Sequence, residues 1–262
     1  MEIARRYQFD DETGPLSLAA RQAKGSKRDP SSFVWLGGFR SDMMGTKAQA
    51  MVDEAAHIGV DSLRFDYSGH GESEGKFIDG TISKWVAQSL QIIREASEGP
   101  QILVGSSMGG WIALRICQEL EKLGEDDRLA GLLLIAPAAD FTSLLMEPEF
   151  NNAQREAIET NGFIAQQSEY SDEPNIITKK LLDDGRGNSV LNGQLRLGIP
   201  VRILQGMKDP DVPYEHAMKL VHELMHDDVT ITLVKNGDHR LSREQDIELL
   251  RRTMQEMAVR NI

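Results

Sequence analysis

Basic residues are scarce in this sequence. Its 262 residues include 29 Lys and Arg against 41 Asp and Glu, so the formal net charge is −12 with His counted as neutral. Proteins that bind nucleic acids or anionic lipid surfaces usually present a basic face, because phosphate groups attract cationic side chains. The sequence contains no dense basic cluster of that kind. The charge therefore argues against nucleic acid as a partner.

Cysteine is almost absent, since Cys117 is the only one in the chain. An internal disulfide is therefore excluded, and no group of Cys and His residues has the spacing of a structural zinc site. We expect Cys117 to be a buried helix residue rather than a reactive thiol.

Long hydrophobic runs are lacking as well. No stretch approaches the roughly 18 uncharged apolar residues that a membrane-spanning helix needs, and the first residues contain no apolar segment of the secretion-signal type. We therefore expect a protein of the cytoplasm with no membrane span.

The remaining composition, 40% hydrophobic and 27% charged, is that of an ordinary globular protein. From residue 31 onward, short apolar runs alternate with helical patterns, and each run ends in turn residues. Several runs are apolar without alternation, which is typical of parallel strands covered on both faces. Strands are expected at Phe33–Leu36, Ser62–Phe65, Ile102–Val104, Gly131–Ile135, Val201–Leu204 and Val229–Val234. Helices are expected at 46–58, 81–97, 108–123, 214–226 and 242–260.

Two further strands, Arg5–Phe9 and Leu16–Gln22, are expected to form a hairpin at the sheet edge, joined through residues 11–14. With the six runs above, they predict an α/β fold with a mostly parallel eight-stranded sheet and helices on both faces.

The alternation of strands and helices fails between Asp140 and Leu197. A connection of that length is usually functional or a small subdomain. Helices are expected at Asn151–Asn161 and Asn175–Asp184, with a turn at 185–188. We interpret residues 141–196 as a small helical lid over the carboxyl ends of the strands, where open α/β sheets bind ligands. Residues 1–140 and 197–262 then form the core.

The pattern Gly-x-Ser-x-Gly occurs twice, around Ser107 and around Ser73. A nucleophile elbow needs a buried strand that enters the turn directly and a helix that leaves it. Ser107 has both, because an apolar strand precedes it and a helical pattern follows from Met108. Ser73 lies several residues beyond its strand, between two glutamates that would oppose an oxyanion. Ser107 is therefore the predicted nucleophile, with a plain helix cap as the alternative.

A serine nucleophile needs a histidine that removes its proton. His239 is the favoured candidate, because it follows the last strand and the usual chain order in this fold is serine, acid, histidine. His70 lies at the correct sheet end but precedes Ser107. The other four are expected to be solvated residues of surface helices: His57, His216, His222 and His226.

The acid should lie at a strand's carboxyl end between nucleophile and histidine. Asp209 fits best, and Asp211 and Asp140 are its rivals. The rejected aspartates would be turn residues or helix caps.

Two backbone N–H groups should hold an oxyanion. They are those of Met108, just after the nucleophile, and Phe39, in the loop after an earlier strand. The side chains of Phe39 and Met108 are candidates to line an acyl pocket. The alternative for this loop is a simple tight turn at Gly37-Gly38.

These motifs resemble the α/β-hydrolase superfamily along nearly the whole chain. The segments that carry the resemblance are Leu36–Lys47, Arg64–Gly71, Val104–Trp111, Gly206–Pro213 and Asp238–Arg240. Within the superfamily the sequence is similar to bacterial relatives of the mitochondrial α/β-hydrolase-domain-containing protein 10, and the segments 168–171 and 182–187 share this similarity. The resemblance implies a serine esterase or thioesterase that acts on acyl glucuronides and on palmitoylated protein cysteines. The chain departs from the mitochondrial relatives in lacking a presequence, which again leads us to expect the cytoplasm.

The expected activity is hydrolysis of carboxylic esters or thioesters through an acyl-enzyme, on a small-molecule or acyl-protein substrate, without a metal or organic cofactor. A peptidase, a C–C hydrolase, an acyltransferase and a non-catalytic ligand-binding relative remain alternatives, because fold does not decide chemistry. A dinucleotide-binding fold is disfavoured, since the Gly-rich turns at 69–71 and 105–110 lack the Gly-x-Gly-x-x-Gly spacing. Acyl-chain length, leaving group and oligomeric state are open at this point.

Overall fold

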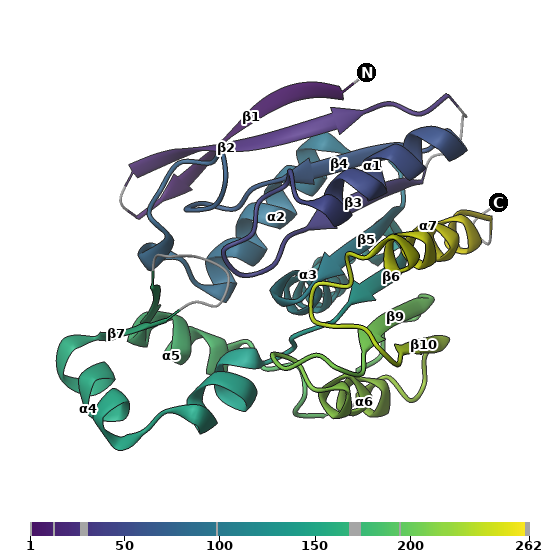
Figure 1. The fold of residues 1–262 in the computed structure, drawn as a ribbon. Helices are drawn as coiled ribbons and strands as arrows, with labels where there is room; N and C mark the ends of the chain where they lie inside the picture. Colours follow the sequence, from purple (N-terminus) through teal and green to yellow (C-terminus); the bar gives the residue numbers. More distant parts are fainter. Residues whose placement is uncertain are drawn as a thin grey trace.

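A single mixed sheet organises the computed structural model, which describes residues 2–12, 14–26, 31–97, 99–167, 174–193 and 195–259 (Figure 1). The sheet has eight strands in the order β1-β2-β4-β3-β5-β6-β9-β10. The strands are β1 Glu2–Asp11, β2 Gly14–Ala23, β3 Ser32–Leu36, β4 Asp61–Phe65, β5 Gln101–Ser106, β6 Leu129–Ile135, β9 Val201–Gly206 and β10 Val229–Val234. The helices beside them are α1 Thr46–Ile58, α2 Ile82–Ala96, α3 Met108–Leu123, α6 Tyr214–Glu223 and α7 Glu244–Val259.

The expected α/β fold is confirmed, and so is the hairpin at the sheet edge. β1 pairs antiparallel with β2, and β2 pairs antiparallel with β4, whereas the six strands from β3 onward pair in parallel. The hairpin strands extend beyond the predicted ranges by several residues. Residue 13, inside the predicted turn, lies outside the described residues.

Helices cover both faces of the sheet because the central strands are apolar on both sides. In β5, Leu103 faces a core that contains Trp85 of α2 and Trp111 of α3. Its neighbours Ile102 and Val104 face the opposite core, which α1 and α7 complete. This alternation is the period of two that a strand imposes on its side chains.

Cys117 lies in α3 and is buried, as predicted. Burial raises the pKa of its thiol well above the usual range. Because the thiolate is the reactive form, this thiol is inert in the folded protein.

The chain between β6 and β9 contains residues 141–196, the segment predicted as a lid and called the insertion below. It contains two short turns, Thr142–Met146 and Glu147–Glu149, followed by α4 Asn152–Asn161, β7 Phe163–Gln166, β8 Asn175–Thr178 and α5 Lys179–Gly187. Figure 1 shows this segment extending from one end of the molecule. Residues 168–173 and 194, including the 168–171 segment of the family resemblance, lie outside the described residues.

Part of the prediction for the insertion is wrong. Residues 175–178 form a strand that pairs antiparallel with β7, not the start of a helix. The two isoleucines of β8 explain the difference, since β-branched side chains favour strands. Thr178 then begins α5, because its side chain accepts the N–H of Leu181, a typical cap. Gly185 and Gly187 lie in the last turn of α5 rather than in a loop.

The insertion is attached to the core at its far end by Asp140. This aspartate is buried, has a φ of 53°, and follows β6. Its carboxylate accepts the N–H of Val190 at 2.9 Å, the N–H of Leu191 at 3.0 Å and the hydroxyl of Ser189 at 2.5 Å. Asp140, a rival candidate for the acid, is thus engaged in closing the insertion.

Candidate active site

Ser107 lies at a sharp turn between β5 and α3. Its backbone has φ 54° and ψ −119°, a region that a residue with a side chain occupies only under strain. The turn requires the backbones of strand and helix to touch. A β-carbon on Gly109 would lie 2.0 Å from the carbonyl oxygen of Leu36, and one on Gly105 would lie 2.5 Å from that of Gly109. The close approach of the backbones therefore excludes a side chain at both glycines of the motif. The turn has the geometry of a nucleophile elbow.

His239 and Asp209 lie beside this serine, although 132 and 30 residues separate the bonded pairs in sequence. The Nε2 atom of His239 is 3.1 Å from Ser107 Oγ, and its Nδ1 atom is 2.8 Å from Asp209 Oδ2. The Asp209 side chain is completely buried, whereas that of His239 is 18% exposed. The structure thus brings the three predicted residues into one chain of hydrogen bonds that opens toward solvent at the imidazole.

Among the described residues, four groups hydrogen-bond to the Asp209 carboxylate, three N–H donors and the His239 imidazole. Its Oδ1 accepts the N–H groups of Asp211 at 3.0 Å and Val212 at 2.8 Å. Its Oδ2 accepts the Gln205 amide at 3.3 Å in addition to His239. A carboxylate bound by several donors keeps its orientation, and it favours the tautomer of His239 with the proton on Nδ1, in which Nε2 faces Ser107 as an acceptor.

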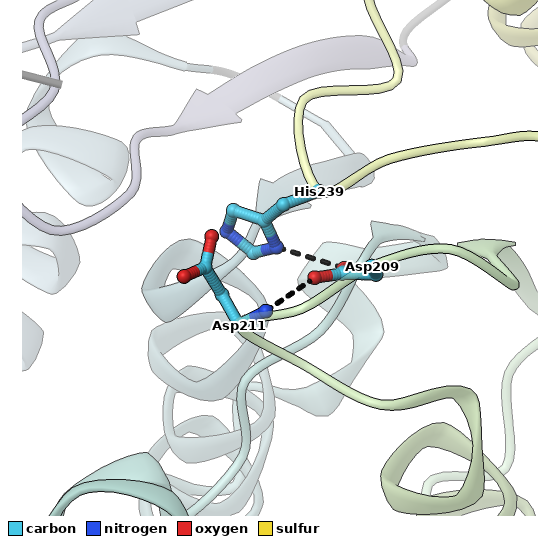
Figure 2. Close-up of side chains that lie close together, drawn as sticks. All are labelled: Asp209, Asp211 and His239. Atoms are coloured by element: carbon cyan, nitrogen blue, oxygen red, sulfur yellow. Dashed lines mark hydrogen bonds and ion pairs between the residues drawn. The ribbon is translucent and has the colours of Figure 1, made fainter. Parts of the chain in front are cut away.

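Asp211 lies next to this pair, with its carboxylate beside the imidazole (Figure 2). Oxygen and nitrogen atoms of Asp209, Asp211 and His239 come within 4.8 Å of one another, a set that could hold a metal ion. However, the atoms of Asp209 and His239 are already engaged with each other and with Ser107. The arrangement therefore fits a proton relay better than a cation site.

The loop after β3 reaches Ser107 from the other side. A β-carbon on Gly38 would lie 3.4 Å from the Ser107 β-carbon and 3.9 Å from its Oγ. The next residue, Phe39, and Met108, directly after Ser107, thus have their backbones next to the serine. The Phe39 ring is partly buried and packs edge-on against Phe77 and Phe141. The Met108 side chain is fully buried in the core.

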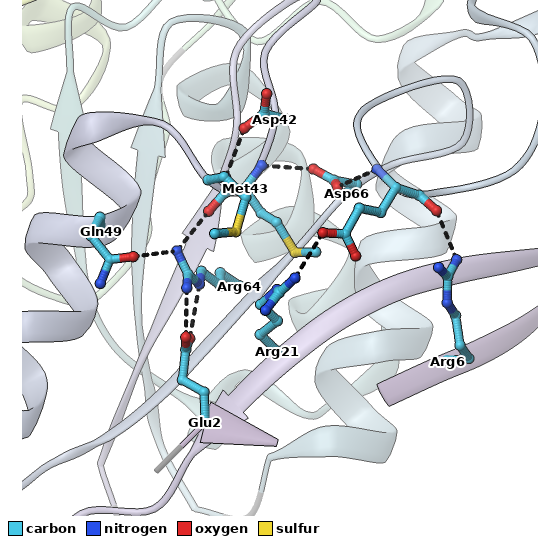
Figure 3. A network of polar contacts seen from close by, with 10 residues as sticks. Glu2, Arg6, Arg21, Asp42, Met43, Gln49, Arg64 and Asp66 are labelled. Atoms are coloured by element: carbon cyan, nitrogen blue, oxygen red, sulfur yellow. Dashed lines mark hydrogen bonds and ion pairs between the residues drawn. The ribbon is translucent and has the colours of Figure 1, made fainter. Parts of the chain in front are cut away.

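Buried polar residues at the end of β4 hold this loop in place (Figure 3). The Met43 N–H donates to Asp66 at 2.7 Å, and the Met43 carbonyl accepts from Arg64 at 3.0 Å. Arg64 is 1% exposed and also binds both oxygens of Glu2 in β1. Burial raises the pKa of Asp66. Sequence reasoning missed this support, although an arginine between Leu63 and Phe65 in a predicted buried strand was a visible signal.

The rival serine has a structural role. The Ser73 hydroxyl donates to the carbonyl of Asp66 at 2.6 Å and accepts the N–H of Ala19 at 2.8 Å. It therefore joins the loop after β4 to the hairpin strand β2.

We expect Ser73→Ala to lower the free energy of unfolding by about 1–3 kcal/mol, because it leaves the Ala19 N–H without its acceptor. Urea unfolding would measure this loss. Turnover should stay near that of the wild type, and a large loss of turnover at unchanged stability would contradict the structural role.

His70 and His216 are both buried in the structure. His70, the rejected rival, is buried among Tyr67, Phe77 and Trp85, and burial lowers its pKa to about 4. The prediction that His216 is solvated is wrong, because it is 3% exposed and its Nε2 lies 2.7 Å from the carbonyl oxygen of Ala139. Helical periodicity places His216 beside apolar residues of α6, which could have indicated its burial.

The chain is similar to known proteins along most of its length. A family model described as "Alpha/beta hydrolase family" matches residues 31–252. The human protein "Palmitoyl-protein thioesterase ABHD10, mitochondrial" is 31% identical over 245 residues, which cover 92% of this chain and 76% of that protein. A crystal structure of an Agrobacterium vitis S4 protein described as a hydrolase is 49% identical, with a TM-score of 0.95 and coverage of 98% and 99% of the two chains. The mouse α/β hydrolase domain-containing protein 10 is 30% identical, with a TM-score of 0.84 and the same coverage. In the part of the chain that the structure describes, no helix is long and apolar enough to cross a membrane.

Proposed function

Because the chain belongs to the α/β-hydrolase family, and is thus a hydrolase as the motifs predicted, we propose that it cleaves acyl thioesters and oxygen esters through an acyl-enzyme on Ser107. The observation that carries this proposal is the hydrogen-bond chain from Ser107 Oγ through His239 to the buried Asp209, at 3.1 and 2.8 Å. Relatives named palmitoyl-protein thioesterases support the thioester half of the proposal.

The proposed reaction has two steps. His239 takes the Ser107 proton as Oγ attacks the acyl carbonyl, and the backbone N–H groups of Phe39 and Met108 stabilise the oxyanion. His239 then gives the proton to the departing thiol or alcohol. In the second step, water attacks the acyl-serine with the same help and releases the acid.

The acyl group is proposed to contact the aromatic side chains beside the serine. Phe39 packs with Phe77, Phe141 and Trp85 at ring separations of 4.8, 5.6 and 6.5 Å. Its partly exposed ring offers an apolar contact for a hydrocarbon chain. The Met108 side chain has no such role in this proposal, because it is fully buried.

We further propose that the insertion acts as the lid over this site. Its support is the hydrogen bond from Arg40, which follows Phe39, to the carbonyl of Pro174 at 2.9 Å. This contact joins the proposed oxyanion loop to the insertion. The cytoplasmic location expected from the sequence stays a prediction, which cell fractionation would test.

A panel of matched thioesters and oxygen esters with acyl chains from two to sixteen carbons tests the proposal. We expect hydrolysis by the wild type, with a mass increase equal to the acyl group on the peptide that carries Ser107 after acid quenching. If no member is hydrolysed while an amide or a β-diketone is, the same residues serve a peptidase or a C–C hydrolase. If the acyl group passes to an added alcohol in preference to water, the protein is an acyltransferase.

A further inference from the structure

Lys47, near the start of α1, reaches the loop that carries His239. Its ammonium group donates a hydrogen bond to the carbonyl of Arg240, the residue directly after the histidine. The contact joins two segments 193 residues apart in sequence. Neither the expected mechanism nor the motif comparison gives Lys47 a role.

The loop around His239 is strained on the side where Lys47 binds. Leu241 has a φ of 44° although it is a leucine, and it is 4% exposed. A backbone of this kind persists only when neighbouring contacts hold it. Asp238 accepts the Leu241 N–H at 3.0 Å, and Lys208 donates its N–H to Gly237 at 2.8 Å. The first bond closes a turn within the loop and the second ties the start of the loop to the segment after β9, whereas Lys47 holds the residue after His239 from α1.

The surroundings of the ammonium group are apolar and acidic. Lys47 lines a small depression together with Leu204, Leu241 and Leu250, which belong to β9, the His239 loop and α7.

The charged groups that face Lys47 are Asp238 and Arg240 of the loop, Asp209 after β9, and Asp246 of α7. Arg243 neutralises part of Asp246 through a bond of 2.8 Å. Burial outweighs the three carboxylates and lowers the pKa of Lys47 to about 8.

We propose that Lys47 is a positioning residue that holds His239 in line with Ser107 and Asp209. The proposal rests on the proposed function only for its catalytic consequence. Because Lys47 contacts neither the reacting atoms nor the acyl pocket, its removal should affect turnover and leave substrate binding almost unchanged. Displacement of a catalytic group by about 1 Å can cost roughly 100-fold in rate.

The proposal predicts a pH dependence with a defined sign. Protonated Lys47 binds the Arg240 carbonyl strongly, and the neutral amine is a much weaker donor. Turnover should therefore fall as pH rises through about 8, the pKa of this group. Arginine at the same position stays protonated in this range, so it should keep the hydrogen bond at higher pH.

The test compares Lys47→Met and Lys47→Arg with the wild type over pH 6–10, with Lys122→Met as a control. Lys122 is an exposed α3 residue paired with Glu119. We expect Lys47→Met to lose 10- to 100-fold in kcat with KM changed less than about threefold. Lys47→Arg should recover most of the activity and lose the decline near pH 8. Hydrogen exchange of residues 235–243 should be faster in Lys47→Met than in the wild type and the control.

If Lys47→Met kept the kcat of the wild type and also its decline near pH 8, the proposal would be overturned. A loss of kcat with unchanged exchange in residues 235–243 would also overturn it. Hydrogen exchange does not depend on the reaction. If the wild type hydrolysed no member of the panel, the proposed function would fail while the exchange data still tested whether Lys47 holds the loop.

Discussion

Ser107→Ala is expected to lower kcat for every substrate of the panel by roughly 10⁶-fold, the loss seen when a triad nucleophile is removed. The alanine keeps the β-carbon, so the elbow and the hydrogen bond between His239 and Asp209 remain. Substrate affinity should change little, because the half-buried side chain loses a single atom. Kinetics at high enzyme concentration, with calorimetric binding of an uncleaved analogue, would separate the two effects.

Ser73→Ala is the matched control for this substitution, since Ser73 lies in the same sequence pattern. It should lose stability and keep turnover, whereas Ser107→Ala should do the reverse. Full activity in Ser107→Ala would refute the proposed nucleophile.

Asp209→Asn is expected to lower kcat by about 10⁴-fold. The reason lies in the donors that surround the carboxylate. The asparagine oxygen would take the N–H groups of Asp211 and Val212, so its NH₂ group would face His239. His239 would then have to accept at Nδ1 and carry its proton on Nε2. In that tautomer it points N–H at Ser107 and accepts no proton from it.

The control is Asp211→Asn, which changes the exposed carboxylate beside the same imidazole. It leaves the Asp211 N–H on Asp209, so we expect kcat within about fivefold of the wild type. The measurement is kcat at saturating substrate for both variants, with melting temperatures to confirm folding. Equal losses in the two variants would mean that Asp209 acts only as one of two local charges.

The central strands of the parallel sheet were predictable because a strand buried on both faces is a short run of apolar residues without alternation. β10 lies at the sheet edge and is only partly buried, and its β-branched residues account for its prediction with the observed bounds, Val229–Val234. α1 and α3 also have the predicted ranges, since Gly59 and Gly124 end them in the left-handed conformation. The insertion was less predictable. β7 and β8 are four residues each, too short for a period of two to stand out, and they need each other to form.

The candidate site was predictable where chain order and strand ends determine position. Ser107, Asp209 and His239 each follow a strand of the parallel sheet, so their meeting at one edge follows from topology. The support around them was not predictable in the same way. Lys47 and Arg240 meet through a helix on one face of the sheet and a loop at its end, and nothing in their spacing indicates that contact. Arg64 of β4 and Glu2 of β1 meet because β2 pairs antiparallel with both of these strands, so the contact depends on how the hairpin is placed at the sheet edge.

The bond of Asp140 to residues 189–191 makes the insertion a closed loop with both ends at one point of the core. Closing a longer loop costs little more entropy, about 0.6 kcal/mol for each doubling of length. The segment between these ends can therefore be lengthened, shortened or exchanged while the strands and their carboxyl-end loops keep their places. The insertion is in this respect a separable unit, and we expect a chimera with a different segment between Asp140 and Ser189 to keep Ser107, Asp209 and His239 in their places.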